Sequence, residues 1–205
     1  MTRVLGAIIA GGRSERYGSP KPLVMLRGER LVDRVARALA AAADEVVLIA
    51  NDAALATAIG LPWRPDELPG MGSLAGVHAA LHWAEERDCG GVLAAAADLP
   101  LLSPALLRRL RALASEGWDV VLPESTGPRG VEPLCAYYAT SCSGAIERAI
   151  ARGDARMIGF HDEVRVQRLP LAEVRTFGEP ERLFANLNSP ADLARLAHLL
   201  AEPAP

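Results

Sequence analysis

The chain has 205 residues, of which half are apolar and 23% are charged, and its net charge is -3. This composition excludes a disordered chain, and the slightly negative charge argues against bulk attraction to nucleic acid, although a local positive site remains compatible with it. Three cysteines without Cys-x-x-Cys spacing argue against a disulfide scaffold or a zinc site. The first apolar run ends at a glycine turn and is poorly flanked for a signal peptide. We therefore expect a cytoplasmic protein with no nucleic-acid or membrane partner.

Apolar runs alternate with amphipathic stretches along the chain. In chain order, the pattern predicts strand 4–10, helix 30–43, strand 45–51, helix 52–60, helix 73–88, strand 91–98, helix 103–117, strand 119–124, strand 133–140, helix 143–153, strand 163–170 and helix 189–202. Strand followed by helix from the N-terminus implies right-handed crossovers and a mostly parallel sheet. We expect one α/β domain over residues 1–205, a Rossmann-like three-layer α/β/α sandwich.

The loop after the first strand combines glycines with basic side chains, in the stretch IIAGGRSERYGSPKPL at residues 8–23. Ligands of open parallel sheets bind at the carboxyl ends of the strands, so this loop is a candidate binding element. Gly11 and Gly12 would let backbone N–H groups approach a polyphosphate closely. Positive charge would come from Arg13, Arg16 and Lys21. The P-loop and dinucleotide fingerprints are both absent, and a plain turn with solvated basic side chains is the alternative.

Asp98 ends the third predicted strand, before the residues LPLL. A carboxylate at a strand tip can hold Mg²⁺, which takes few protein ligands and keeps several waters. The alternative is an aspartate that caps the following turn. A phosphate-binding loop at the same sheet edge favours the metal site.

The stretch PGMGSLAG surrounds the start of the predicted helix 73–88. Gly70 and Gly72 fit a turn that lets backbone approach a planar ligand, whereas Gly76 inside the helix fits close packing. Asp66 upstream could accept hydrogen bonds from a base or a ribose. The alternative is a tight turn with Ser73 as the N-cap.

Near the C-terminus, NLNSP places Asn186 and Asn188 two residues apart, so both amides face the same way on an extended segment. They could touch a ligand or a metal-bound phosphate. The alternative is that Asn188 caps a turn before the last helix.

His78 and His82 are four residues apart on a predicted helix and so share one face. That spacing can bind zinc, but the glutamate of His-Glu-x-x-His is missing, which favours a surface or packing role. Cys135 lies in an apolar strand and is expected in the core.

These motifs together resemble the molybdenum cofactor guanylyltransferases, a family with a glycosyltransferase-A-like, nucleotide-diphospho-sugar transferase fold. The first loop is similar to the motif Leu-Ala-Gly-Gly-x-Ser-x-Arg-Met-Gly-x-x-Lys at Gly11, Gly12, Ser14, Arg16, Gly18 and Lys21. Further segments resemble the family at PGMGSLAGVHAAL, ADLPLLSP, EPLCAYY and FANLNSPADL, and the resemblance covers residues 4 to 197. The chain departs from the family pattern at Tyr17, Ser73 and Ala97, and none of these departures removes a charged group.

The resemblance implies an enzyme that transfers GMP from GTP to the phosphate of molybdopterin and releases pyrophosphate. The implied catalytic residues are Arg16, Lys21 and Asp98, with Asp98 also holding Mg²⁺. The implied substrate-binding residues are Ala10, Gly11, Gly12, Ser14, Gly18, Asp66, Gly72, Ser73, Leu74, Gly76, Asn186 and Asn188. The segments EPLCAYY and ARMIGF would shape the pterin site. The acceptor phosphate is already anionic, so no strong general base is required.

Other functions stay open at this stage. One is a cytidylyltransferase for molybdopterin, or a sugar-phosphate nucleotidyltransferase, of the same fold. Another is a non-catalytic GTP-binding accessory protein that delivers cofactor to an apo-enzyme. For the guanylyltransferase itself, transient contact with molybdoenzymes or other cofactor-biosynthesis proteins is a further expectation. An NAD-dependent oxidoreductase is disfavoured by the missing fingerprint.

Overall fold

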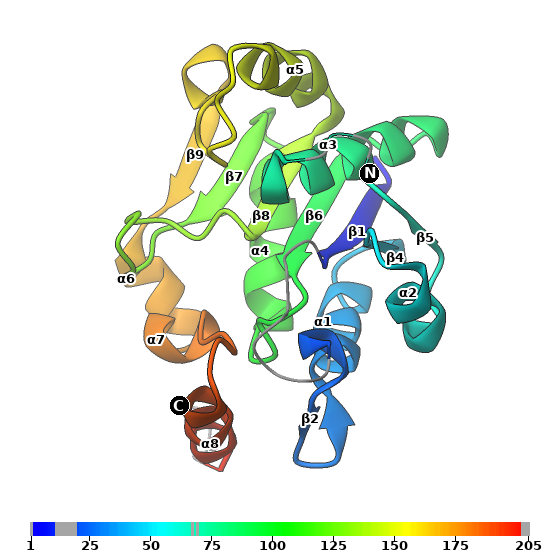
Figure 1. The fold of residues 1–205 in the computed structure, drawn as a ribbon. Helices are drawn as coiled ribbons and strands as arrows, with labels where there is room; N and C mark the ends of the chain where they lie inside the picture. Colours follow the sequence, from blue (N-terminus) through cyan, green and yellow to red (C-terminus); the bar gives the residue numbers. More distant parts are fainter. Residues whose placement is uncertain (1, 11–19, 67, 69, 202–205) are drawn as a thin grey trace.

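A seven-stranded sheet lies at the centre of the molecule, with strand order β5-β4-β1-β6-β8-β7-β9 (Figure 1). The computed structural model describes residues 2–10, 20–66, 68 and 70–201. The sheet strands are β1 (Val4–Ile9), β4 (Glu45–Ile49), β5 (Trp63–Arg64), β6 (Gly91–Ala96), β7 (Val120–Pro123), β8 (Cys135–Ala139) and β9 (Val166–Leu169). A separate antiparallel hairpin is formed by β2 (Met25–Leu26) and β3 (Glu29–Arg30).

Helices cover both faces of the sheet, as expected for a three-layer sandwich. The helices are α1 (Leu31–Ala40), α2 (Ala53–Ile59), α3 (Gly72–Glu86), α4 (Pro104–Ala114), α5 (Ser143–Ala151), α6 (Leu171–Val174), α7 (Pro180–Leu183) and α8 (Pro190–Leu199). Buried side chains of α1, α2 and α4 form one core with the sheet, and those of α3 and α5 form the core on the other face. Every helix and strand that periodicity predicted is present, with somewhat shorter bounds.

The fully buried strand β1 explains why its sequence reads as a continuous apolar run. Val4 and Ile8 point into the core with α1 and α4, whereas Leu5, Ala7 and Ile9 point into the core with α3. A strand covered on both faces has no wet side, so the usual alternation of apolar and polar residues disappears.

Strand β8 is the exception to the parallel arrangement. Strands β5, β4, β1 and β6 are mutually parallel, but β8 pairs antiparallel with both β6 and β7. The connection from β7 to β8 carries no helix of its own, and a parallel return would need a long crossover. The chain therefore reverses direction and inserts β8 between its two neighbours.

Two helix ends carry residue types that commonly cap helices. Ser103 Oγ accepts a hydrogen bond from the N–H of Leu106, and Pro104 begins α4. Gly60 closes α2 in the left-handed conformation with φ +79°. Within the described residues, no helix is both long enough and apolar enough to cross a membrane.

His161 is a partly buried histidine whose protonation opposes folding. Its ring meets the Phe160 ring edge-on at a centroid distance of 5.0 Å, and its Nε2 has no hydrogen-bond partner among the described residues. Burial, followed by the positive charge of Arg168, lowers the pKa of His161 to about 4. The unfolded chain takes up this proton at a pKa of about 6.5, so it binds more protons than the folded chain between these two values.

We therefore expect stability that is complete above about pH 6.5 and that is lost as the pH falls toward 4. Urea unfolding at pH 7 and at pH 4.5 would measure the loss. The variant His161→Leu should lose less stability than the wild type over this interval, by about 2 kcal/mol. Equal losses in the two proteins would contradict the assignment to His161.

Candidate functional site

The carboxyl ends of three neighbouring strands meet at one edge of the sheet. Ile9 at the end of β1 pairs with Ile49 of β4 and with Ala96 of β6. The N–H of Ala10 donates to Ile49 O at 2.9 Å, and the N–H of Ala97 donates to Ile9 O at 3.1 Å. The residues that follow these strands therefore begin side by side, which is where parallel sheets bind ligands.

The glycine-rich part of the first loop cannot be placed against this edge. The predicted residues Gly11, Gly12, Arg13, Ser14, Arg16 and Gly18 lie outside the described residues. Their roles as phosphate-binding and catalytic residues stay predictions. Ala10 before them and Lys21 after them are both described, and they fix where the loop leaves and rejoins the fold.

The side chain of Lys21 contacts a segment near the C-terminal end of the chain. Its Nζ donates to Asn188 Oδ1 at 3.0 Å, and Asn188 Nδ2 donates to Asn186 Oδ1 at 3.1 Å. This confirms that the two amides face the same way. The cap of α8 is Ser189, which forms a capping box with Asp192, so the side chain of Asn188 is not the helix cap. The two asparagines instead extend the polar cluster around Lys21.

Asp98 directly follows β6 and is partly buried. Burial raises the pKa of Asp98, and the positive charge of Lys21 offsets part of this rise. Lys21 and Asp98 therefore lie within electrostatic reach of each other at the same sheet edge. The sequence predicted this pairing from the position of each residue after a strand.

Glu132 is a second acidic residue at this site that sequence reasoning did not single out. Its Oε1 accepts a hydrogen bond from the N–H of Leu134 at 3.1 Å. Burial raises the pKa of Glu132, and the negative charge of Asp98 raises it further, while Arg129 lowers it. Two neighbouring, sheltered carboxylates are a donor set that a hard divalent cation prefers. The available signal was a glutamate three residues before the start of the buried strand β8.

Asp66 is held in place by Asn51, which sequence reasoning also missed. Asn51 Nδ2 donates to Asp66 Oδ2 at 2.8 Å, and the N–H of Asp66 donates to Asn51 Oδ1 at 2.9 Å. Asn51 follows β4 directly after Ala50, so this two-point contact fixes Asp66 beside the carboxyl end of that strand. The signal for Asn51 was its position after a strand, the same signal that identified Asp98.

The turn before α3 has the backbone that its glycines predict. Gly70 and Gly72 have φ values of +87° and +57°, in the left-handed region that favours glycine. Met71 is the N-cap residue of α3, and Ser73 lies inside the first turn of the helix. The alternative prediction of Ser73 as the N-cap is therefore wrong.

Two residues of α3 that the resemblance assigned to substrate binding face the core. Leu74 is fully buried, so a contact between Leu74 and substrate would involve its backbone. A Cβ added to Gly76 would stand 2.8 Å from Ile9 Cγ2, closer than real contacts allow. The predicted packing role of Gly76 is confirmed, and its contact with substrate stays a prediction.

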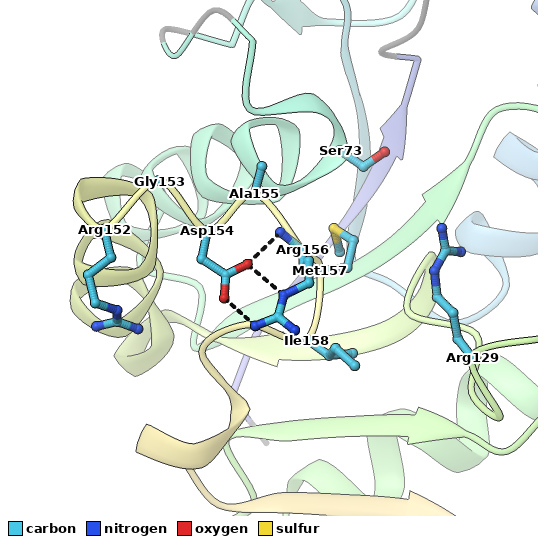
Figure 2. Close-up of a pocket in the computed structure, with 9 residues that line it drawn as sticks. All are labelled: Ser73, Arg129, Arg152, Gly153, Asp154, Ala155, Arg156, Met157 and Ile158. Carbon is cyan, nitrogen blue, oxygen red and sulfur yellow. Dashed lines mark hydrogen bonds and ion pairs between the residues drawn. The ribbon is translucent and has the colours of Figure 1, made fainter.

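A pocket of about 790 Å³ opens beside the first turn of α3 (Figure 2). It is lined by Ser73, Arg129, Arg152, Gly153, Asp154, Ala155, Arg156, Met157 and Ile158. The ARMIGF segment predicted for the pterin site begins at Ala155, so its first four residues do line a pocket. The EPLCAYY segment does not line it in the described part of the chain, because Cys135 and Tyr138 are fully buried in the core.

The arginines of the pocket differ in how they are held. Arg156 is bound to Asp154 through Nε and Nη2, at 2.9 and 2.7 Å, and Figure 2 shows this pair on the wall formed after α5. Arg152 donates to Glu163 at 2.9 Å. Arg129 makes no hydrogen bond or ion pair with any side chain in the described ranges, and it approaches from the opposite wall. Its guanidinium interacts electrostatically with Glu132 and forms no ion pair within the described part of the chain that would prevent it from binding an anion in the pocket.

The domain described as MobA-like NTP transferase matches residues 6–166. The molybdenum cofactor guanylyltransferase of Cereibacter sphaeroides is 35% identical over 204 residues, covering 98% of this chain and all of the relative. The crystal structure of molybdopterin-guanine dinucleotide biosynthesis protein A from Archaeoglobus fulgidus has a TM-score of 0.80 at 30% identity, covering 97% of this chain and 99% of that one. Rv0371c of Mycobacterium tuberculosis, solved in complex with manganese, shares the fold with a TM-score of 0.66 at 17% identity, over 96% of this chain and 99% of that one.

The matching family model and the α/β fold define the class of this protein as the nucleotidyltransferases. The chain belongs to the MobA-like NTP transferase family, in the branch of the molybdenum cofactor guanylyltransferases.

Proposed function

We propose that this enzyme transfers GMP from GTP to the terminal phosphate of molybdopterin and releases pyrophosphate. Family membership and the names of its full-length relatives support this reaction. The observation that carries the proposal is the electrostatic interaction between Lys21, which follows the first loop, and Asp98, which follows β6. A cation beside an acidic residue at a strand tip is what a metal-bound triphosphate requires.

In this reaction an acceptor phosphate oxygen forms a bond to the α-phosphorus of GTP, and the bond from that phosphorus to the bridging oxygen breaks. Lys21 would neutralise charge on the β- and γ-phosphates, with Arg16 predicted to neutralise the leaving pyrophosphate. Asp98, with Glu132 beside it, fits Mg²⁺ because both carboxylates are sheltered and close enough to interact. Bound Mg²⁺ would supply charge neutralisation on the phosphate oxygens.

The protonation of the cysteines and the shielding of His161 agree with catalysis that depends on positioning and charge and uses no nucleophile or base of the protein. Burial raises the pKa of Cys142 to about 12 and that of Cys135 further, so both thiols stay protonated and unreactive at neutral pH. His161 is partly buried, its Nε2 atom is shielded from solvent, and its pKa is lowered to about 4. The anionic acceptor needs none of these groups as a base, because it is already deprotonated.

The nucleoside would lie between the loop after β1 and the start of α3. Asp66, oriented by Asn51, would accept hydrogen bonds from the ribose or the base. The left-handed turn at Gly70 and Gly72 leaves the backbone open to a planar ring, since no atom of the described residues lies within 4 Å of a Cβ placed at either glycine. We assign guanine here on the strength of the family branch.

The acceptor would bind in the pocket lined by Arg129 and Ser73, on the other side of the start of α3. We expect Arg129→Ala to raise the KM for molybdopterin about 10-fold, because one charge-assisted hydrogen bond to an anion contributes about 1.5 kcal/mol. The KM for GTP should stay unchanged. Steady-state pyrophosphate release measures both constants.

The matched control is Arg108→Ala, which removes an exposed arginine from α4, on the opposite face of the sheet. It should leave both constants unchanged. An equal rise of both KM values in Arg129→Ala would place Arg129 outside a dedicated acceptor pocket.

The reaction is tested by mixing the protein with Mg²⁺, molybdopterin and each of the four ribonucleoside triphosphates, and by measuring pyrophosphate. Release with GTP alone is the expected result. Release with CTP instead would keep the mechanism and replace the base assignment. GTP binding without pyrophosphate release, with intact acceptor, would favour an accessory protein that only carries nucleotide.

A further inference from the structure

Three side chains with metal-ligating atoms meet on the outer side of helices α3 and α5. The two helices pack on the same face of the sheet, and they share one core (Figure 1). His78 and His82 come from successive turns of α3, with ring centroids 4.2 Å apart. Glu147 comes from α5, and its Oε1 lies 3.3 Å from His78 Nε2 and 3.5 Å from His82 Nε2.

These separations match the ligand spacing of a tetrahedral zinc ion. Ligand atoms at about 2.05 Å from zinc stand about 3.4 Å from one another in a tetrahedron. Both histidine–glutamate distances agree with this value, and the ligating atoms of all three residues lie within 4.8 Å of one another. The ligand that would have to move to reach tetrahedral spacing is an imidazole ring, which can turn about its χ2 angle.

The carboxylate of Glu147 is free to act as a ligand. The neighbouring Arg148 points to Glu163, with its Nε 2.6 Å from Glu163 Oε2, so it does not neutralise Glu147. Among the described residues, Glu147 pairs only with the two histidines. The exposed fraction of the side chain is 12% for His78, 42% for His82 and 55% for Glu147, so the site has a protein side and an open side for a water ligand.

We propose that His78, His82 and Glu147 form a second metal site, which binds Zn²⁺ or a similar transition-metal ion. Two imidazoles and one carboxylate suit such an ion better than Mg²⁺, which prefers oxygen ligands and keeps its waters. The site is separate from Asp98, which follows β6 at the sheet edge. It does not depend on the proposed reaction.

A metal at this position would join the two helices that carry the walls of the pocket. The first turn of α3 contributes Ser73, and α5 leads directly into the pocket segment at residues 152–158. Because the ligands lie on different elements, binding would favour the folded arrangement over the unfolded chain. We therefore expect added Zn²⁺ to raise the Tm by about 5 °C at a concentration 100 times the Kd.

Calorimetric titration of the metal-free, untagged full chain with Zn²⁺ tests this site. The titration is made on the Asp98→Ala background, so that zinc bound at the sheet edge does not contribute to the stoichiometry. One equivalent of Zn²⁺ should bind, and Glu147→Gln or His82→Ala on that background should weaken binding by at least about 100-fold. Co²⁺ as a second probe should give the visible absorption of a four-coordinate site, and both variants should lose it.

The control is Glu116→Gln, which removes an exposed carboxylate from the turn after α4. Its zinc affinity should equal that of the parent. Because the side chains of Glu147 and His82 are partly exposed, both variants should have the same Tm as the parent in the absence of metal. Thermal unfolding without metal therefore checks that both variants fold. Zinc binding that is absent from the parent, or unchanged in both variants, would overturn the proposal. These measurements use no nucleotide, so they are independent of the outcome for GMP transfer.

Discussion

Asp98→Ala should lower kcat for GMP transfer by about 100- to 1000-fold, the loss found when one group that stabilises transition-state charge is removed. The reason is that Asp98 follows β6 and interacts electrostatically with Lys21, and it would hold the divalent ion that neutralises the phosphates. Initial rates of pyrophosphate release at saturating GTP measure the effect.

The fold should not depend on Asp98. Burial raises the pKa of this carboxyl, which means that the folded environment opposes its charge. Removing it should therefore leave the free energy of unfolding unchanged or slightly higher in urea titrations at pH 7. A catalytic residue that costs stability is typical of a functional site.

The matched control for Asp98→Ala is Asp88→Asn. Asp88 is exposed after α3 with φ +53°, a conformation that asparagine tolerates well. The substitution removes the same charge without straining the turn, and activity should stay unchanged. Full turnover in Asp98→Ala would remove the metal-binding role of Asp98.

Lys21→Met should also lower kcat/KM for GTP by about 100-fold or more, because it removes a positive charge from the phosphate site while keeping the length of the side chain. Lys21 is partly exposed and its hydrogen bond to Asn188 is a surface contact, so the loss of stability should stay below about 1 kcal/mol. Steady-state kinetics and urea unfolding measure the two quantities.

Two further variants separate the effect of the positive charge of Lys21 from the effect of its orientation by Asn188. Asn188→Ala removes the acceptor of the Lys21 hydrogen bond but keeps the charge, so its loss of activity should be much smaller than that of Lys21→Met. Arg27→Asn removes a positive charge from the exposed hairpin turn, at φ +51°, and should have no effect. An equal loss in Lys21→Met and Asn188→Ala would show that Lys21 acts through the asparagines and not through its charge.

The long elements could be predicted because each has a repeated physical signal. Helix α1 shows apolar residues at helical spacing, and β1 and β6 are buried on both faces and read as continuous apolar runs. The hairpin β2–β3, the strand β5 and the short helices α6 and α7 were not predicted. Elements of two to four residues are too short to show a period, and packing against the rest of the chain decides their conformation.

The residues of the candidate site also divide into those that the sequence indicated and those that it did not. Lys21, Asp98 and Asp66 could be singled out from the sequence, because each lies in a segment that follows a predicted buried strand and precedes the next predicted helix. Glu132 and Asn51 were missed, since one precedes an antiparallel strand and the other acts through Asp66. The sequence favoured a surface or packing role for His78 and His82, because the glutamate of His-Glu-x-x-His is missing. Glu147 is far away along the chain and meets the two histidines only when α5 packs on α3.

The sequence by itself determined the α/β class, the buried strands, the helix caps and the chemical character of the loops that follow the strands. These are local properties, set by side-chain polarity, periodicity and backbone preference. Only the tertiary structure decided the insertion of β8 between β6 and β7, the contact of Lys21 with Asn188, and the meeting of two histidines with Glu147. Each of these joins residues far apart in sequence, and such contacts depend on how the whole sheet and its helices pack together.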